Sequence, residues 1–244
     1  MGLREELEMS GEWLFRWRSF VPLALFSPLF WLGWQESKGE VTVAWEAICC
    51  AVSLLGLAVR CVVVGYAPPR TSTRSTKHFV AHSLSTQGVY SIVRHPLYVG
   101  NFLMWLGMAL LLLEGPLLLV FCLIYWLYYE RIMLVEEAFL RTKFGSQFEL
   151  WSSRTPALIP LFSQWERPTQ PFCCRTVRRK EYTGFFALLA AFFALHLLTN
   201  EFDHRSLQVT TGHFMLLSLG AALYLSVIIL KKRTTWLKSK SQVS

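Results

Sequence analysis

Arg94, His95 and Pro96 combine two basic side chains with a helix-starting proline at the edge of a long apolar stretch. Proline disfavours helix at the preceding residue and suits the first turn of a helix, so a helix is predicted to begin at Pro96. The free N–H groups and positive dipole of that helix end can hold a carboxylate or a phosphate. Arg94 can add a bidentate donor to such an anion. The alternative is an arginine that reaches the membrane surface beside a capping histidine.

Two adjacent carboxylates, Glu136 and Glu137, end a second apolar stretch, about two helical turns after Glu130 and Arg131. Paired carboxylates at that position can meet a cationic ligand group such as an ammonium or a sulfonium. A solvated helix end would carry the same residues, and this reading stays open. Ionisable groups at the boundary of a membrane are costly and mark a functional site by default. Arg131 lies five residues before Glu136, so the two side chains do not share a helix face.

The elements that position these residues are apolar helices. Of the 244 residues, 53% are hydrophobic and 16% are charged, whereas soluble domains carry about 25% charged residues. Six apolar stretches approach or reach the length of a membrane span, at 15–34, 43–65, 97–113, 117–135, 182–199 and 212–230. The chain is therefore predicted to be an all-α polytopic membrane protein of about six transmembrane helices. Pro116 indicates that the third and fourth form a tight helical hairpin.

The formal net charge of +8 predicts topology more than it predicts a partner. With six spans and a cytoplasmic N-terminus, nearly all of the 24 Lys and Arg residues lie on the cytoplasmic side. Lys38 and Arg205 are the cations of the external loops, and Arg60 lies inside the second span. This distribution indicates contact with anionic lipids and argues against nucleic-acid binding. The six cysteines have no C-x-x-C spacing, so neither a zinc site nor a disulfide framework is indicated.

The segment at 139–151 interleaves apolar and charged residues behind the carboxylate pair. This pattern predicts either an amphipathic helix that covers a site from above or an ordinary interfacial anchor. Glycine-rich nucleotide-binding loops and the G-x-S-x-G and H-E-x-x-H motifs are absent from the sequence. The chemistry of soluble Rossmann methyltransferases and hydrolases therefore does not apply.

The two polar segments together resemble the cofactor motif of the isoprenylcysteine carboxyl methyltransferase and phospholipid methyltransferase superfamily. The first block reads His82-x-Leu84-x-Thr86-x-Gly88-x-Tyr90-x-x-x-Arg94-His95-Pro96-x-Tyr98-x-Gly100. The second block reads Arg131-Ile132, Glu136-Glu137-x-x-Leu140, Phe144-Gly145 and Ile159-Pro160. Phe148 and Trp151 stand where tyrosines are common in the family, a departure that bears on the polarity of the pocket.

The resemblance implies a division of the chain and a bound cofactor. It implies a methyltransferase core at 66–181, between transmembrane helices at 1–65 and a C-terminal transmembrane helix pair with a basic tail at 182–244. S-adenosylmethionine is expected between the cytosolic segments and the hairpin. By analogy, its ligands are His82 and Leu84 on the adenosine side, and Gly88, Tyr90, His95, Tyr98 and Glu136. Arg94, Arg131 and Glu137 are expected to orient the methyl acceptor.

An anionic oxygen acceptor needs no general base, so positioning and desolvation can supply most of the acceleration. An amine would arrive protonated and would need a base, and no obvious neutral base accompanies the motif, which favours O-methylation. The runs at 90–101 and 127–133 and the helices after 181 resemble bacterial lipid A 1-phosphate methyltransferases. Lipid A in a bacterial inner membrane is therefore the leading expectation for the acceptor. The alternatives are a prenylcysteine carboxylate, an ethanolamine headgroup, and a non-enzymatic scaffold or transporter, and the oligomeric state stays open.

Overall fold

The computed structural model describes residues 2–36, 41–68, 81, 83–200, 218, 221 and 224, and every named element in this part of the chain is a helix. The prediction of an all-α chain is confirmed for these residues. α3 (Val43–Tyr66) and α6 (Gly115–Phe144) are long and apolar enough to cross a membrane, and α5 (Pro96–Leu112) is a shorter apolar helix. The span predicted at 212–230 lies outside the described residues except for three isolated positions, so the six-span arrangement stays a prediction.

The predicted hairpin of the third and fourth spans is confirmed. α5 ends at Leu112 and α6 begins at Gly115, with Pro116 in its first turn. A positive φ of 46° at Gly115 suits glycine and lets the chain reverse within this short link. At its other end α5 begins at Pro96 with His95 as its N-cap, as the sequence predicts.

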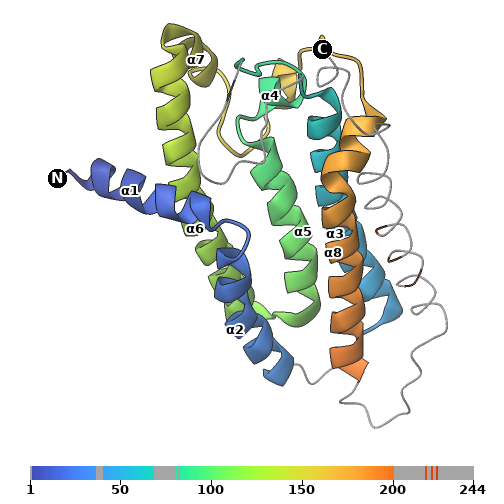
Figure 1. Ribbon diagram of the computed structural model, residues 1–244. Coiled ribbons are helices and arrows are strands. Elements are labelled where there is room, and N and C mark those ends of the chain that lie inside the picture. Colours follow the sequence, from blue (N-terminus) through green and yellow to red (C-terminus); the bar gives the residue numbers. More distant parts are fainter. Residues whose placement is uncertain are drawn as a thin grey trace.

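The first predicted span, 15–34, is divided between two helices. α1 (Leu3–Arg16) and α2 (Val21–Glu36) are separated by a short turn, and α1 lies across α6 at a steep angle to α2 (Figure 1). α1 buries Gly11 against α6 and exposes Trp13. A helix with one covered face and exposed aromatic residues is typical of a position along a membrane surface. The structure therefore corrects the single span, because only its later part, α2, is one continuous helix.

Small residues let α3 and α5 pack closely. A β-carbon added at Gly56, Gly100 or Gly107 would overlap atoms of the opposing helix. Ser53 Oγ donates a hydrogen bond of 2.8 Å to the carbonyl of Met104 across the same contact. Small residues at such interfaces allow membrane helices to approach closely and to gain van der Waals contact. α8 (Cys174–Asn200), which begins before the span predicted at 182–199, packs against α3 (Figure 1).

Three short elements gather at one end of the bundle, beside the start of α5 (Figure 1). They are α4 (Val89–Ile92), α7 (Ser146–Ser152) and the 3₁₀-helix η1 (Phe162–Gln164). Phe148 and Trp151 of α7 are buried. The segment predicted at 139–151 is thus divided between the end of α6 and α7, and the buried residues of α7 face into the protein.

Replacement of Gly107 by valine is expected to destabilise the protein, because the added side chain would collide with Ser53 and the carbonyl of Cys49. Overpacking of this kind costs about 1–3 kcal/mol, so the Tm in detergent should fall. Leu55→Val, at an exposed position of α3, is the matched control and should leave the Tm nearly unchanged. Equal Tm values for the two variants would contradict the close packing of α3 on α5.

Candidate functional site

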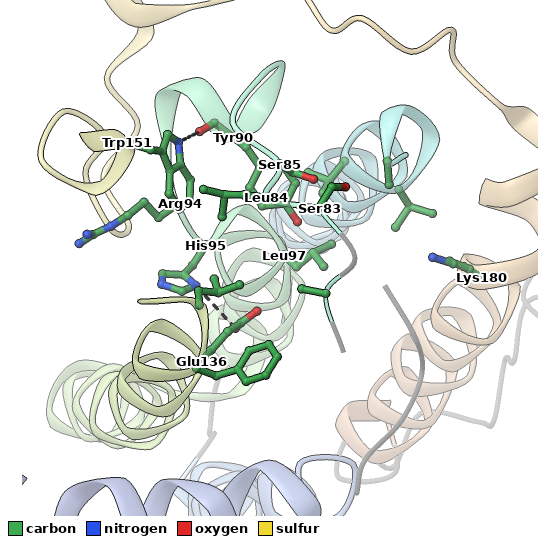
Figure 2. Close-up of a pocket in the computed structure, with 16 residues that line it drawn as sticks. Ser83, Leu84, Ser85, Tyr90, Arg94, His95, Leu97, Glu136, Trp151 and Lys180 are labelled. Atoms are coloured by element: carbon green, nitrogen blue, oxygen red, sulfur yellow. Dashed lines mark hydrogen bonds and ion pairs between the residues drawn. The ribbon is translucent and has the colours of Figure 1, made fainter. Parts of the chain in front are cut away.

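A cavity with charged side chains among its mostly apolar wall residues lies at the end of the bundle where α4, α7 and the start of α5 meet, and we call it the polar cavity (Figure 2). Its volume is about 120 Å³, and a second cavity of about 250 Å³ adjoins it. Both are lined by Val63 of α3 and by Leu84, Ser85 and Tyr90. Lys180 reaches toward the first cavity from α8, on the side opposite Trp151 (Figure 2). The two polar segments of the sequence and the C-terminal helix therefore meet at one space.

The backbone of the Arg94–His95 pair is held by a loop that follows α7. The N–H of Arg94 donates to the carbonyl of Pro156 at 2.8 Å, and that of His95 donates to Ala157 at 3.1 Å. Leu161 N–H returns a bond of 2.9 Å to the carbonyl of Ile92. The loop carbonyls therefore occupy the N–H groups just before the N-cap and at the N-cap of α5, and anion binding by the first turn of this helix stays a prediction.

The carboxylates of Glu136 and Glu137 lie beside that helix start, one near each nitrogen of the His95 ring, and Nδ1 lies 3.8 Å from Glu136 Oε2. His95 Nε2 lies 2.9 Å from Glu137 Oε1, where the ring donates because a carboxylate only accepts. Arg94 Nε lies 3.3 Å from the same oxygen. Glu136 instead accepts a hydrogen bond of 2.9 Å from the hydroxyl of Tyr98. Its side chain is 34% exposed and lines the cavity, so Glu136 is the carboxylate available to a cationic ligand.

Arg94 turns its guanidinium away from this space. In Figure 2 the group points away from Ser83 and Leu84 on the cavity wall, and Nη1 lies 3.4 Å from the carbonyl of Ser152, to which it donates. The stem of Arg94 still lines the cavity. The structure therefore brings Arg94 and Glu137 together beside His95, and the guanidinium of Arg94 lies against α7.

Two further residues of the first motif block lie in the wall of the cavity. Leu84 and Tyr90 line it, and Trp151 Nε1 donates a hydrogen bond of 3.0 Å to the carbonyl of Tyr90. Burial raises the pKa of the Tyr90 phenol, so it stays neutral at physiological pH. Gly88, at a φ of 62°, donates its N–H to the carbonyl of Glu166 at 3.1 Å and starts α4. His82 lies outside the described residues.

Arg131 does not join the cavity. Its Nη1 donates to Ser10 Oγ of α1 at 3.4 Å. Five residues of α-helix turn the side-chain direction by roughly 140°, so Arg131 and Glu136 leave α6 toward different neighbours. The expected group of Arg94, Arg131 and Glu137 is therefore brought together only in part.

The structure adds a buried ion pair that the sequence reading did not include. Arg60 of α3 donates to both carboxylate oxygens of Glu181 on α8, at 2.8 and 2.9 Å, and its Nη1 donates to Asn101 Oδ1. A charged residue inside an apolar span is a signal of function, and Arg60 is one. Its partner is 121 positions away, so no local pattern could identify Glu181.

An apolar cavity of about 300 Å³ lies between α5 and α6. Its walls are Tyr98, Val99, Phe102, Cys122, Tyr125, Trp126, Tyr129, Met133 and Leu158. Tyr98 therefore has two roles, since its ring lines this apolar space while its hydroxyl holds Glu136 of the polar cavity.

Comparison with known proteins finds a family model and several relatives. Residues 47–147 match the family model described as phospholipid methyltransferase. The chain is 38% identical over 94 residues to protein-S-isoprenylcysteine O-methyltransferase of Schizosaccharomyces pombe, covering 36% of this chain and 40% of that protein. It is 33% identical over 97 residues to protein-S-isoprenylcysteine O-methyltransferase B of Arabidopsis thaliana, covering 37% and 49%. The matches thus span less than half of the length of these two relatives.

A longer match is to the cobalt-zinc-cadmium resistance protein CzcN of Cupriavidus metallidurans, 37% identical over 188 residues. It covers 77% of this chain and 80% of that protein. No solved structure matches the chain. The family match includes Arg60, Arg94, His95, Glu136 and Glu137, which the structure gathers at one end of the bundle. The chain therefore belongs to the isoprenylcysteine carboxyl methyltransferase and phospholipid methyltransferase superfamily.

Proposed function

We propose that this protein transfers the methyl group of S-adenosylmethionine to an anionic oxygen of a membrane-anchored acceptor. The observation that carries the proposal is that Tyr98 lines the apolar cavity while its hydroxyl bonds to Glu136, which lines the polar cavity. A cationic cofactor and a long apolar chain can each occupy the cavity whose chemistry suits it. Membership of a methyltransferase superfamily supports the reaction class.

The residues of the polar cavity fit the cofactor. Glu136 presents a carboxylate to an ammonium or a sulfonium, and Tyr98 orients that carboxylate. Tyr90 and Trp151 offer aromatic surface, and the adjoining cavity adds Thr86 and Gln87 as polar partners. When bound, S-adenosylmethionine supplies an electrophilic methyl group. The protein's own contribution is to balance positive charge, to hold both reactants in line and to exclude water beneath α7.

The acceptor proposed first is the carboxylate of an isoprenylcysteine. The names of the fission yeast and Arabidopsis relatives favour it, and the apolar cavity suits an isoprenoid or acyl chain because its walls are almost entirely apolar. Lipid A 1-phosphate, the leading expectation from the sequence, has no support among these relatives. It remains a second acceptor for testing, because it presents the same chemistry of an anionic oxygen on an apolar anchor. An ethanolamine headgroup would need a base for its protonated amine.

The arrangement in the membrane is part of the proposal. We propose six spans, with the polar cavity facing the cytoplasm, because basic residues gather on that side of the predicted topology. The core at 66–181 would then contain both cavities, and a bacterial inner membrane is the proposed location.

Calorimetry on the detergent-solubilised protein tests the cofactor. We expect micromolar binding of S-adenosylmethionine by the wild type and a loss of at least about tenfold in Glu136→Gln, which removes the charge and keeps the shape. His95→Ala, which frees Glu137, should also weaken binding. Glu149→Gln is the matched control, because that carboxylate is 66% exposed on α7. A well-folded wild type that binds no cofactor, with or without lipid, would overturn the proposal.

Turnover with a labelled methyl donor tests the acceptor and the pair beside His95. The wild type should methylate an S-farnesylcysteine derivative in preference to lipid A and to phosphatidylethanolamine. Arg94→Ala and Glu137→Ala should each lower kcat at least about 100-fold, because they displace the groups that orient the reactants. Arg141→Ala is the control, because it removes an exposed cation of α6, the helix that carries Glu137. Near-normal kcat in both site variants would contradict the site assignment, and preference for lipid A would replace the first acceptor with the second.

A bulky residue in the apolar cavity tests where the acceptor chain binds. Val99→Trp should raise KM for a long-chain acceptor at least about fivefold while cofactor binding is unchanged, since it fills apolar space. Leu119→Trp, at an exposed position of α6, is the control. An unchanged KM in a folded Val99→Trp variant would exclude this cavity as the chain site.

A further inference from the structure

The ion pair between Arg60 and Glu181 joins α3 to α8 and is largely shielded from solvent. The two side chains are 22% and 6% exposed, and they share two hydrogen bonds of 2.8 and 2.9 Å. Removing two charges from water is costly, and a buried pair is weak evidence for stability in itself. A bidentate pair held between two apolar helices therefore calls for a reason beyond joining the helices.

The pair lies within one helical turn of residues that line the polar cavity. Arg60 also donates to Asn101 of α5, so that three helices meet at its guanidinium. Each of those helices supplies a cavity-lining residue within one turn of the contact, namely Val63, Leu97 and Lys180. A substitution at the pair would therefore displace cavity-lining residues on all three helices.

A continuous path of contacts leads from Asn101 to the cavity carboxylate. Asn101 Nδ2 donates to Tyr129 Oη at 3.3 Å, and the Tyr129 ring packs on Tyr125 with 4.4 Å between centroids. Tyr125 Oη donates to the carbonyl of Tyr98 at 2.9 Å. The hydroxyl of Tyr98 in turn holds Glu136. The α8 carboxylate is thus connected to the group that would face a cationic cofactor.

The charge of Arg60 also acts on the cavity directly. Burial raises the pKa of Tyr90, which lines the cavity, and the Arg60 cation opposes that rise. A cation within this range would repel a sulfonium in the same space, because a low-dielectric surrounding screens charge poorly. Glu181 neutralises that cation through its two hydrogen bonds.

We propose that Arg60 and Glu181 form a positioning pair for the cofactor site. Glu181 neutralises the Arg60 cation beside the cavity and so favours a cationic cofactor, and the contacts of Arg60 hold α3, α5 and α8 together around the cavity. The C-terminal helix α8 is then part of the methyltransferase unit, through a residue at its cytosolic end that touches no reactant. This role rests on the proposed binding of S-adenosylmethionine.

The test compares the affinities of S-adenosylmethionine and S-adenosylhomocysteine, which lacks the methyl group and the positive charge. Glu181→Gln leaves Arg60 unpaired, so it should weaken S-adenosylmethionine at least about fivefold more than S-adenosylhomocysteine. The double variant Arg60→Gln/Glu181→Gln has no net charge change and should return the ratio of the two affinities to near the wild-type value. Glu136 and Lys180 are unchanged in every variant, so the ratio isolates the pair.

If the pair only joins α3 to α8, breaking it should lower Tm and weaken both ligands by the same factor. An unchanged ratio of the two affinities in Glu181→Gln would overturn the proposal. If Glu181→Gln does not fold, Arg60→Gln carries the test, since the carboxylate left behind should shift the ratio toward S-adenosylmethionine. An unshifted ratio there would overturn it equally. A wild type that binds neither compound would instead overturn the proposed function itself, and this role with it.

Discussion

Two neighbouring carboxylates at the end of an apolar helix need partners, and the polar end of the molecule is arranged around that need. Glu137 contacts His95 and Arg94, whereas Glu136 accepts a hydrogen bond from the hydroxyl of Tyr98 and lies 3.8 Å from the other ring nitrogen of His95. Because adjacent residues of a helix point in different directions, one carboxylate becomes internal and the other faces a cavity. The start of α5 must therefore lie against the end of α6, and the short turn of the hairpin permits this antiparallel approach.

The division between polar and apolar space follows from the same contact. Tyr98 is held at its hydroxyl by Glu136 and at its carbonyl by Tyr125, so the wall of the apolar cavity is fixed next to the carboxylate of the polar cavity. One side carries charged and hydroxyl groups from α6, α8 and the segment before α4. The other side is a cavity with aromatic walls from α5 and α6. A reaction between a cationic donor and an acceptor with an apolar anchor needs both environments within reach of one point.

Local signals in the sequence predicted much of this, and non-local contacts did not follow from it. Pro96 and Pro116 act on their own turns, so the start of α5 and the hairpin were predictable. Arg94, His95 and Glu136 were predicted from their types and positions, whereas Leu84 and Tyr90 were found only through the family resemblance. The partner of Arg60 could not be found, because pairing across 121 positions leaves no periodic trace. The break between α1 and α2 was missed although Arg16, Arg18 and Ser19 interrupt the apolar stretch at that point. The placement of Arg131 against α1 depends on a helix whose path no pattern specified.

The loop that holds the Arg94–His95 backbone has a consequence for the order in which the molecule is built. The hairpin of α5 and α6 is local in sequence and can form as soon as it enters the bilayer. The carbonyls of Pro156 and Ala157 and the carboxylate of Glu181 are synthesised later, and they must return to partners made much earlier. Contacts of such long sequence separation form slowly because their chain entropy is lost first. A nascent chain would therefore acquire its membrane anchor well before its cavity, and would be inserted in the membrane before it could bind a ligand.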